Sequence, residues 1–575
     1  MKTKYPGGII SVFLGVFLLS APASAQLTPC QNTGNVRCIG TQAGDYASLA
    51  SALSSAPQGT IIKFRKSSVP YTGSGNRNVI VSLPVTITSE YGNPDDVVID
   101  LGGVRQTRFL VISQGNTTST INFEISHLTI KNGFIDNLCN PLPCPPVNDS
   151  GGAILIYNVK TGVVIQNNIF INNYAYTGGA VALRPTVITN NHRDVTLRQN
   201  IFYLNRATPF GGAVAFMPQQ TNLFSLNIES NHFENNVALR GQGEAIYVGE
   251  QNLNSGNTSI FKNTIKANGT VPNPGQCIYI ENIRQSFIYD NFIQDNIAPG
   301  YGWGMIVYLV GANDTHYFYH NTLANNYHPS GLQAGSVIET RTGKFPGNNI
   351  LGIENNIFWD IAPTHNTNQL LNITSASTTV SVNNNNIQAG FTGGSGNYST
   401  SPGFIKNPSS STSLNGDYHI KATSLNRNSR PVVSLPSIGA PADDIDGNPR
   451  PTASGALVDV GADQFGLIHY YRGLNGLLKG VSGTTVDLVW IDTPQRTGTP
   501  YLSDMKLTTP VQIPGIIGNL WLTGTIVPLA PFTTSINGEA FMPITIPPGS
   551  VGTIYSQIVA QNPFEFSNLS QLNMQ

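Results

Sequence analysis

Short runs of alternating apolar and polar residues recur along the middle of the chain, separated by turns rich in Asn and Gly. One repeat has an apolar alternation, an Asn, an apolar pair, a second Asn, a short turn, a small residue and another apolar alternation. It is clearest at 164–183, 195–216 and 226–248, and weaker copies follow. Alternation with a period of two predicts β-strands with one buried face rather than amphipathic helices.

The first Asn of each copy gives the length of the repeat. These residues lie 32, 31, 32, 28, 30, 35 and 29 positions apart, at Asn168, Asn200, Asn231, Asn263, Asn291, Asn321, Asn356 and Asn385. A repeat of this length with three short strands predicts coils stacked at about 4.8 Å. Equivalent Asn side chains would then lie above one another, where their amides can bond along the stack and to the turns. The predicted fold class is all-β, a right-handed parallel β-helix with three strands per coil.

The stacking of the coils also predicts the roles of certain Phe residues and of one His residue. Phe170, Phe202 and Phe233 occupy one position in consecutive coils, which indicates an aromatic ladder in the core. His127 lies where the line of Asn residues would place its preceding member, and we expect it to be a structural hydrogen-bonding residue.

The two ends of the repeat array differ from its middle. The stretch 45–56 has apolar residues on one helical face and predicts a capping helix that covers the first coil. After residue 466 the repeat stops, and strands at 485–491, 517–522, 541–546 and 553–560 predict a C-terminal antiparallel β-sandwich. The predicted domains are a β-helix over 26–466 and a sandwich over 467–575.

Residues 1–25 predict a signal peptide, with Lys2 and Lys4, an apolar run and an Ala-Ser-Ala cleavage site. We therefore expect a secreted or cell-surface protein with no transmembrane segment. Removing these two lysines from 30 basic side chains leaves 28 against 31 acidic ones, a net charge of about −3. Charged residues make up only 11% of the chain, which argues against a nucleic-acid partner because such proteins need a basic stripe.

The five cysteines include two close pairs. Export would allow a disulfide between Cys30 and Cys38 and another between Cys139 and Cys144. Cys277 remains, and we expect a buried, inert thiol there.

Three sequence elements resemble known β-helix proteins. A Gly-Gly-Ala-apolar element at 151–154, 178–181 and 211–214, with Phe-x-x-Asn at 170–173, 202–205 and 233–236, resembles the repeats of polymorphic outer-membrane proteins. The segments 444–451 and 458–463 resemble the conserved end of β-helix proteins of the choice-of-anchor Q type. Over about residues 40–465 the chain thus resembles the pectin-lyase-like superfamily, which includes lyases, glycoside hydrolases, epimerases and adhesins.

Side chains that follow one strand of successive coils form the main candidate site. Tyr247 and Tyr279 are equivalent outward positions one coil apart, and neighbouring tyrosines can stack on sugar rings. Five charged residues lie near them: Glu244, Glu250, Glu281, Arg240 and Arg284. We expect Glu250 and Arg240 to assist binding, whereas Glu244, Glu281 and Arg284 are the catalytic candidates, since lyases and hydrolases need carboxylates or a base. Tyrosines packed under a loop are the structural alternative.

Two further groups could carry chemistry. Asp314, His316, Glu339 and Arg341 form a weaker cluster near a loop. Four aspartates of the terminal motif are candidate Ca²⁺ ligands, although closing the fold is the alternative role: Asp444, Asp446, Asp459 and Asp463.

The sequence therefore predicts a secreted β-helix that binds extracellular polysaccharide or a cell-surface partner. The alternative is a polysaccharide lyase or glycoside hydrolase acting on a uronate-containing polymer, with Ca²⁺ as the candidate cofactor. Neither the polymer nor catalysis follows from the residues alone.

Overall fold

The computed structural model divides the chain into two compact units, one of which is Cys30–Phe465 while the other includes Gly466–Gln575. The described residues are 29–114, 121–136, 149–157, 159, 161–184, 194–217, 225–239, 242–249, 256–269, 275–297, 306–310, 314–326, 337–342, 348–360, 371–373, 378–388, 393–408, 416–432, 441–453, 455–465, 468–472, 479–480, 485–491, 497–512, 519–529, 531–533, 539–545, 552–560, 565–566 and 570–574.

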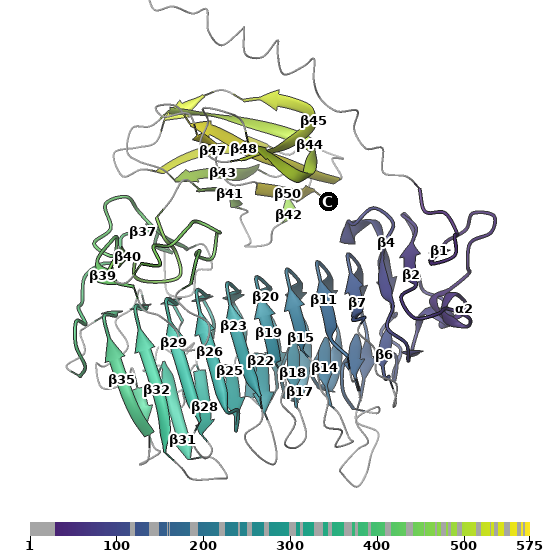
Figure 1. The fold of residues 1–575 in the computed structure, drawn as a ribbon, viewed down its shortest axis with the longest axis horizontal. Coiled ribbons are helices and arrows are strands. Elements are labelled where there is room, and N and C mark those ends of the chain that lie inside the picture. Colours follow the sequence, from purple (N-terminus) through teal and green to yellow (C-terminus); the bar gives the residue numbers. More distant parts are fainter. Residues whose placement is uncertain are drawn as a thin grey trace, which may run out of the picture. The chain divides into compact units, whose positions relative to one another are not determined.

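Three parallel sheets form the first unit, and successive coils add strands to each of them in turn (Figure 1). Sheet A contains β1 (Val36–Ile39), β2 (Ile61–Phe64), β4 (Thr86–Ser89), β7 (Phe123–Ser126), β11 (Val163–Gln166), β15 (Val195–Arg198), β19 (Ser225–Glu229), β23 (Asn257–Phe261), β26 (Gln285–Tyr289), β29 (Thr315–Tyr319), β32 (Asn349–Glu354) and β35 (Thr378–Asn383). Sheet B contains β5 (Val98–Asp100), β8 (Thr129–Lys131), β12 (Ile169–Ile171), β16 (Ile201–Tyr203), β20 (His232–Glu234), β24 (Thr264–Lys266), β27 (Phe292–Gln294), β30 (Thr322–Ala324), β33 (Ile357–Trp359) and β36 (Asn386–Ile387).

Sheet C closes each coil. It contains β3 (Val79–Val81), β6 (Leu110–Ile112), β9 (Phe134–Ile135), β10 (Ile154–Ile156), β13 (Tyr174–Thr177), β14 (Val181–Leu183), β17 (Arg206–Phe210), β18 (Val214–Phe216), β21 (Val237–Ala238), β22 (Gln242–Gly249), β25 (Gln276–Glu281), β28 (Ile306–Val310), β31 (Ile338–Thr342) and β34 (Leu371–Ile373). Neighbouring strands of all three sheets are parallel, with Leu197 for example opposite Ile228. The all-β class with a parallel β-helix is thereby confirmed.

The first Asn of each coil forms the predicted ladder. Asn200 Nδ2 donates to Asn231 Oδ1 at 3.0 Å, and Asn231 Nδ2 donates to Asn263 Oδ1 at 3.1 Å. Asn231 Nδ2 also donates to the Leu197 carbonyl at 2.8 Å, while its Oδ1 accepts the backbone N–H of Asn200 at 3.0 Å. One amide thus connects three coils and satisfies polar backbone groups that would otherwise be buried without partners.

The second Asn of the repeat forms a ladder of its own. Asn205 Nδ2 donates to Asn236 Oδ1 at 3.1 Å, and the series continues to Asn326, whose N–H donates to Asp360 Oδ1 at 2.9 Å. An aspartate accepts hydrogen bonds there as an amide would. Each coil therefore has two corners held by side-chain amides.

The residue before each ladder Asn has a left-handed backbone. The φ values include 55° at Asn167, 54° at Gln199 and 53° at Asp290. His127, with φ of 57°, belongs to this column of left-handed residues. The next residue, Leu128, occupies the ladder position, and its N–H donates to Asn168 Oδ1 at 3.1 Å. The sequence-based register for His127 was therefore wrong by one residue, because the corner residue precedes the ladder position.

The inward side chains form one continuous core. Phe202 stacks between Phe170 and Phe233, with ring centroids 5.0 and 4.8 Å apart, and all three are fully buried. The predicted aromatic ladder is confirmed, and Cys277 is buried beside this core.

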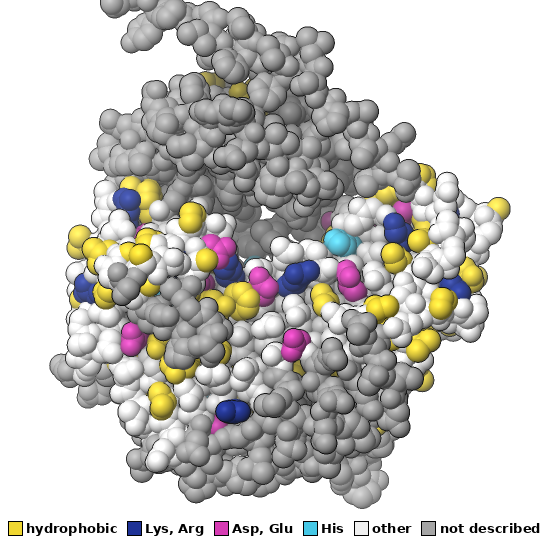
Figure 2. All heavy atoms as spheres, viewed as in Figure 1, with side chains coloured by type: hydrophobic (Ala, Val, Ile, Leu, Met, Phe, Trp, Pro, Cys, Tyr) yellow, Lys and Arg dark blue, Asp and Glu magenta, His cyan; other side chains and the backbone are white. Residues whose placement is uncertain are grey.

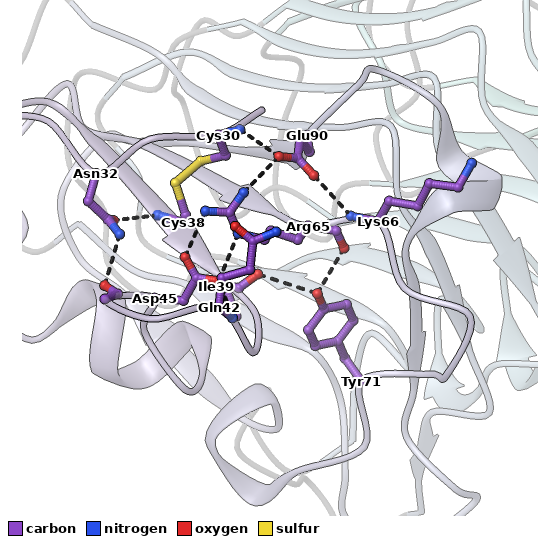
Figure 3. Close-up of a disulfide and its surroundings, with 11 residues drawn as sticks. Cys30, Asn32, Cys38, Ile39, Gln42, Asp45, Arg65, Lys66, Tyr71 and Glu90 are labelled. Carbon is purple, nitrogen blue, oxygen red and sulfur yellow. Dashed lines mark hydrogen bonds and ion pairs between the residues drawn. A yellow bond between two sulfur atoms is a disulfide. The ribbon is translucent and has the colours of Figure 1, made fainter. Parts of the chain in front are cut away.

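The N-terminal end is capped (Figure 3). The helix α2 (Leu49–Leu53) begins after Ser48, which exchanges hydrogen bonds with Ser51 in a capping box. The predicted disulfide Cys30–Cys38 is present, and Asn32 Oδ1 accepts the Cys38 N–H at 2.8 Å, so this donor of the edge strand β1 is occupied. Cys139 and Cys144 lie outside the described residues.

After the last coil the chain returns over the outside of sheet B. We call the described residues of 404–465 the closing segment; it contains β37 (Phe404–Lys406), β38 (Asp417–Ile420), β39 (Arg430–Pro431) and β40 (Leu457–Val458). Its apolar side chains, including Tyr418 and Val460, pack with Phe292 and Ile357 in a second buried cluster. Ala462 N–H donates to Thr322 Oγ1 at 3.0 Å.

The second unit is also β-structure. One sheet contains β41 (Ile468–Arg472), β43 (Thr485–Ile491) and β47 (Glu539–Thr545). The other contains β42 (Lys479–Gly480), β44 (Thr497–Gln512), β45 (Asn519–Pro528), β46 (Phe532–Thr533), β48 (Gly552–Ala560), β49 (Glu565–Phe566) and β50 (Ser570–Met574). Nearly all pairs are antiparallel, as predicted. Among described residues, the helices are too short to cross a bilayer.

Candidate functional site

Glu244 stands where earlier coils have the second Gly of the Gly-Gly-Ala element. That glycine is required where coils approach closely, since a Cβ on Gly179 would collide with the Gly212 carbonyl oxygen. At β22 the register changes: Gln242 pairs with Gln276 and Ile246 with Ile278, so β25 has two fewer residues than β22 between these paired positions. The side chain of Glu244 is accommodated at this irregularity.

The Glu244 carboxyl group serves the fold. It is 1% exposed, and its Oε2 accepts the Ala238 N–H at 2.5 Å. Burial raises the pKa of Glu244 to about 8, although hydrogen bonds from the Ala238 and Gly275 backbone act in the opposite direction. The group is thus mostly protonated at neutral pH and binds backbone donors where the coil shortens.

Tyr247 and Tyr279 lie on the outer side of sheet C, while the alternating Ile246 and Val248 face the core. Both rings are only 3% exposed, and they stack on each other with centroids 5.5 Å apart and planes at 12°. Phe210 packs against the Tyr247 ring at 4.7 Å. The outward register was predicted, but in this structure the two ring faces contact protein and leave little surface for a sugar.

Glu281 is held by Tyr247, whose Oη donates to Glu281 Oε2 at 2.6 Å. Opposite Glu281 in register is Gly249, where a Cβ would collide with the Tyr247 hydroxyl group. Arg284 is exposed between β25 and β26. Arg240 and Glu250 lie outside the described residues, and the roles assigned to this group stay predictions.

The second predicted cluster is spread over two sheets. His316 lies in β29 of sheet A, is fully buried, and places Nδ1 2.8 Å from Ser286 Oγ. Burial lowers the pKa of His316 to about 3, so its ring is neutral. Glu339 and Arg341 belong to β31 of sheet C, and Asp314, directly before β29, is fully buried. A polymer in solution cannot reach His316 or Asp314 in this conformation.

The terminal motif closes the fold through its aspartates. Asp444 Oδ1 accepts the N–H groups of Asp446 and Asn448 at 2.9 and 2.7 Å, and its Oδ2 accepts that of Gln464 at 2.7 Å. Asp459 accepts the N–H groups of Asn428 and Phe465, both at 2.6 Å. These bonds join parts of the closing segment that are distant in sequence.

Arg450 links that motif to the solenoid. Its Nη2 lies 3.0 Å from Asp290 Oδ1 and donates to the Gly461 carbonyl at 2.9 Å. Burial raises the pKa of Asp290 to about 7, while Arg450 acts to lower it. The corner column of the solenoid therefore provides a carboxyl group that pairs with the closing segment, which sequence reasoning missed.

Three of the four candidate metal ligands converge. One oxygen each of Asp444, Asp446 and Asp463 lie within 4.8 Å of one another, and Asp459 is not part of this group. Burial raises the pKa of Asp444 to about 6, and it raises the pKa of Asp463 well above its ordinary value, because a desolvated carboxylate is unfavourable. An all-oxygen set of this kind suits a hard cation such as Ca²⁺, so these residues fit the metal expected from the sequence.

A fourth feature is an aromatic surface on the outside of sheet A that the sequence analysis did not identify. One column runs Glu229, Phe261, Tyr289, Tyr319, Glu354, and the next runs Asn227, Ser259, Phe287, Tyr317, Gly352. Rings stack along both columns, Phe261 with Tyr289 at 4.8 Å and Phe287 with Tyr317 at 5.5 Å. The signal was available, since period-two alternation puts these five rings on one face of three strands.

No known protein family matches the chain, and no curated protein does either. The structure thus defines the class, a parallel β-solenoid compatible with a pectin-lyase-like fold, but does not assign it to a family.

Proposed function

We propose that this protein binds an extracellular polysaccharide along the outer face of sheet A without cleaving it. A β-solenoid is compatible with polysaccharide binding and with lyase or hydrolase activity, so side chains must decide between them. The observation that carries the proposal is the pair of aromatic columns on β23, β26 and β29. The disulfide Cys30–Cys38 supports export, since such bonds persist in oxidising compartments.

The columns favour a long ligand. Each crosses consecutive coils spaced at about 4.8 Å, so the surface extends along the solenoid axis. Phe287 and Tyr319 are buried. Phe261, Tyr289 and Tyr317 are partly exposed, and because the rings stack on one another they present edges rather than full faces. Tyr317 is the last ring of its column, and it borders Gly352, which has no side chain; a Cβ there would lie 3.2 Å from the Tyr317 ring. We therefore place the principal sugar contact at Tyr317, which is partly exposed.

The charge of this face favours a neutral polymer. Its other outward positions from β19 to β35 are uncharged apart from Glu229 and Glu354: Ser225, Asn227, Asn257, Ser259, Gln285, Thr315, Ile350, Thr379, Ser381 and Asn383. On the face in view, Figure 2 shows acidic and basic side chains interspersed among uncharged ones, with no large patch of one sign. A uronate polymer would find no cationic side chain among these positions, and two glutamates would repel it.

The catalytic alternative has weaker support. Lyases and hydrolases need an accessible base or a pair of accessible carboxyl groups. Glu244 binds backbone donors inside the fold, and Glu281 accepts a hydrogen bond from a buried tyrosine.

The test is affinity electrophoresis and calorimetry of the exported protein with neutral and uronate-containing polymers. Tyr317→Ala and Tyr289→Ala should each weaken binding of a neutral polymer by about 5- to 30-fold, corresponding to 1–2 kcal/mol of lost contact. Tyr203→Ala is the matched control, a half-buried outward tyrosine on β16 of sheet B, and should bind as the unmodified protein does. An equal loss of affinity in all three variants would refute the assignment of polysaccharide binding to the outer face of sheet A. Uronate release at 235 nm or reducing sugar that disappears in Glu281→Gln would instead establish the lyase or hydrolase.

A further inference from the structure

The carboxyl groups of Asp444, Asp446 and Asp463 come from two stretches of the closing segment, one on either side of β40. Asp444 and Asp446 lie before Arg450, and Asp463 follows β40. Their ligand oxygens lie within 4.8 Å of one another, which is about twice a Ca²⁺–oxygen distance of 2.3–2.6 Å. One ion could therefore contact all three.

Asp463 supplies an independent sign of a missing ligand. It is 2% exposed, and Oδ2 accepts the Ile420 N–H at 2.7 Å. Its Oδ1 is buried without any hydrogen-bond partner. Buried carboxylate oxygens are nearly always satisfied, because leaving one unpaired is costly.

The carboxyl groups around this oxygen share one nitrogenous side chain. His419 Nε2 lies 3.1 Å from Asp446 Oδ2, and its Nδ1 lies 2.7 Å from Asp417 Oδ1. One imidazole is thus shared by two aspartates. Asp444 and Asp463, both buried, add two more carboxyl groups beside it.

We propose that Asp444, Asp446 and Asp463 bind one Ca²⁺ ion that joins the two stretches of the closing segment on either side of β40. The remaining coordination positions fall to water, since the Asp446 side of the group is partly exposed. The ion would hold the residues that cover β27, β30 and β33, and so tighten the end of the solenoid. This site is distinct from the aromatic surface and does not depend on polysaccharide binding.

The test uses the full exported chain after removal of metal with EDTA. Titration with Ca²⁺ by calorimetry should show one saturable site, Tb³⁺ should give sensitised luminescence that Ca²⁺ displaces, and Ca²⁺ should raise the Tm. Asp463→Asn should weaken Ca²⁺ binding by at least about tenfold, because a ligand and its charge are lost. Without Ca²⁺ the same variant should be at least as stable as the parent, since Asn keeps an acceptor for the Ile420 N–H and removes a buried carboxyl oxygen that has no partner.

Asp443→Asn is the matched control. This neighbouring carboxylate is 46% exposed and pairs with Lys262 at 2.5 Å, outside the group. It should bind Ca²⁺ like the parent. If Asp463→Asn does not fold, Asp446→Asn replaces it, as Asp446 is more exposed. Absence of saturable binding by the parent at millimolar Ca²⁺, or unchanged affinity in the folded Asp463 or Asp446 variant, would overturn the proposal; protons would then neutralise these carboxylates.

Discussion

Replacing Asn231 by Ala removes one member of the first amide ladder from the middle of the solenoid. The side chain is 2% exposed and makes four hydrogen bonds, two through Nδ2 and two through Oδ1. Its loss leaves the backbone N–H and side-chain amide of Asn200 and the Leu197 carbonyl without these partners. Each buried polar group left unpaired costs about 1–3 kcal/mol, so we expect a loss of about 3–6 kcal/mol.

Urea denaturation followed by circular dichroism measures the free energy of unfolding, and amide hydrogen exchange shows where the fold loosens. Each coil contacts only its neighbours, so faster exchange should concentrate in the coils containing Asn200, Asn231 and Asn263. Asn227→Ala, four residues earlier on the outer face of β19, should change stability by less than about 1 kcal/mol. An Asn231→Ala protein within about 1 kcal/mol of the parent, with unchanged exchange, would refute the reasoning.

A substitution that keeps the volume of the Asn231 side chain tests the contribution of its amide group alone. Asn231→Asp keeps the shape but places an acceptor against the Leu197 carbonyl and Asn263 Oδ1. A buried carboxyl group has a folded pKa above its unfolded value, so its destabilising effect should be full at neutral pH and decrease as the pH falls toward 4. A pH-independent deficit would contradict the role of the donated hydrogen bonds.

Three further predictions concern the candidate site and the cap. Glu244 has a folded pKa of about 8 against an unfolded value of 4.5, so its contribution to stability should decline as pH rises from about 4.5 to 8. Glu244→Gln should remove this pH dependence of stability, which is on the order of 3–5 kcal/mol in all. If the urea midpoints of the variant and the parent depend on pH in the same way, the buried location of Glu244 is contradicted. Tyr247→Ala should lower the free energy of unfolding by about 3–5 kcal/mol because a large buried side chain is truncated, whereas Tyr247→Phe should lower it by about 1 kcal/mol. A folded Tyr247→Phe protein that loses a polymer-cleaving activity would show that the hydroxyl group is catalytic. Replacing both Cys30 and Cys38 by Ser should lower stability by roughly 2–3 kcal/mol, measured by thermal unfolding, and an unchanged Tm would show that the disulfide does not stabilise the cap.

The sequence was sufficient for the solenoid because its signals repeat. The spacing of Asn168, Asn200 and Asn231 is nearly constant, and stacked parallel strands are the arrangement that brings such residues into one line. The error at His127 arose because a corner residue with positive φ and the ladder residue are adjacent, and in this coil the ladder position is occupied by Leu128 instead of Asn. Local alternation could not distinguish the two positions.

Site residues were harder to predict because exposure depends on what covers an outward side chain. Tyr247 and Tyr279 do point away from the core, yet the alternation cannot show that their rings pack on each other and on Phe210. Glu244 could have been recognised, since it replaces a Gly that close coil packing requires. The pairing of Arg450 with Asp290, 160 positions apart, and of His419 with Asp446 depends on the path of the closing segment, which no local pattern encodes.

Equivalent residues of successive coils are direct neighbours on parallel strands throughout the three sheets of the solenoid. Thr196 and Asn227 face outward and are register partners on β15 and β19, so their Cα atoms should be about 4.8 Å apart, within disulfide range. The Thr196→Cys/Asn227→Cys protein should form this disulfide under mild oxidation, detected by mass spectrometry of peptides. Thr196→Cys/Ser259→Cys spans two coils, about 10 Å, and should remain reduced. A disulfide in the second protein but not in the first would contradict coil-by-coil stacking.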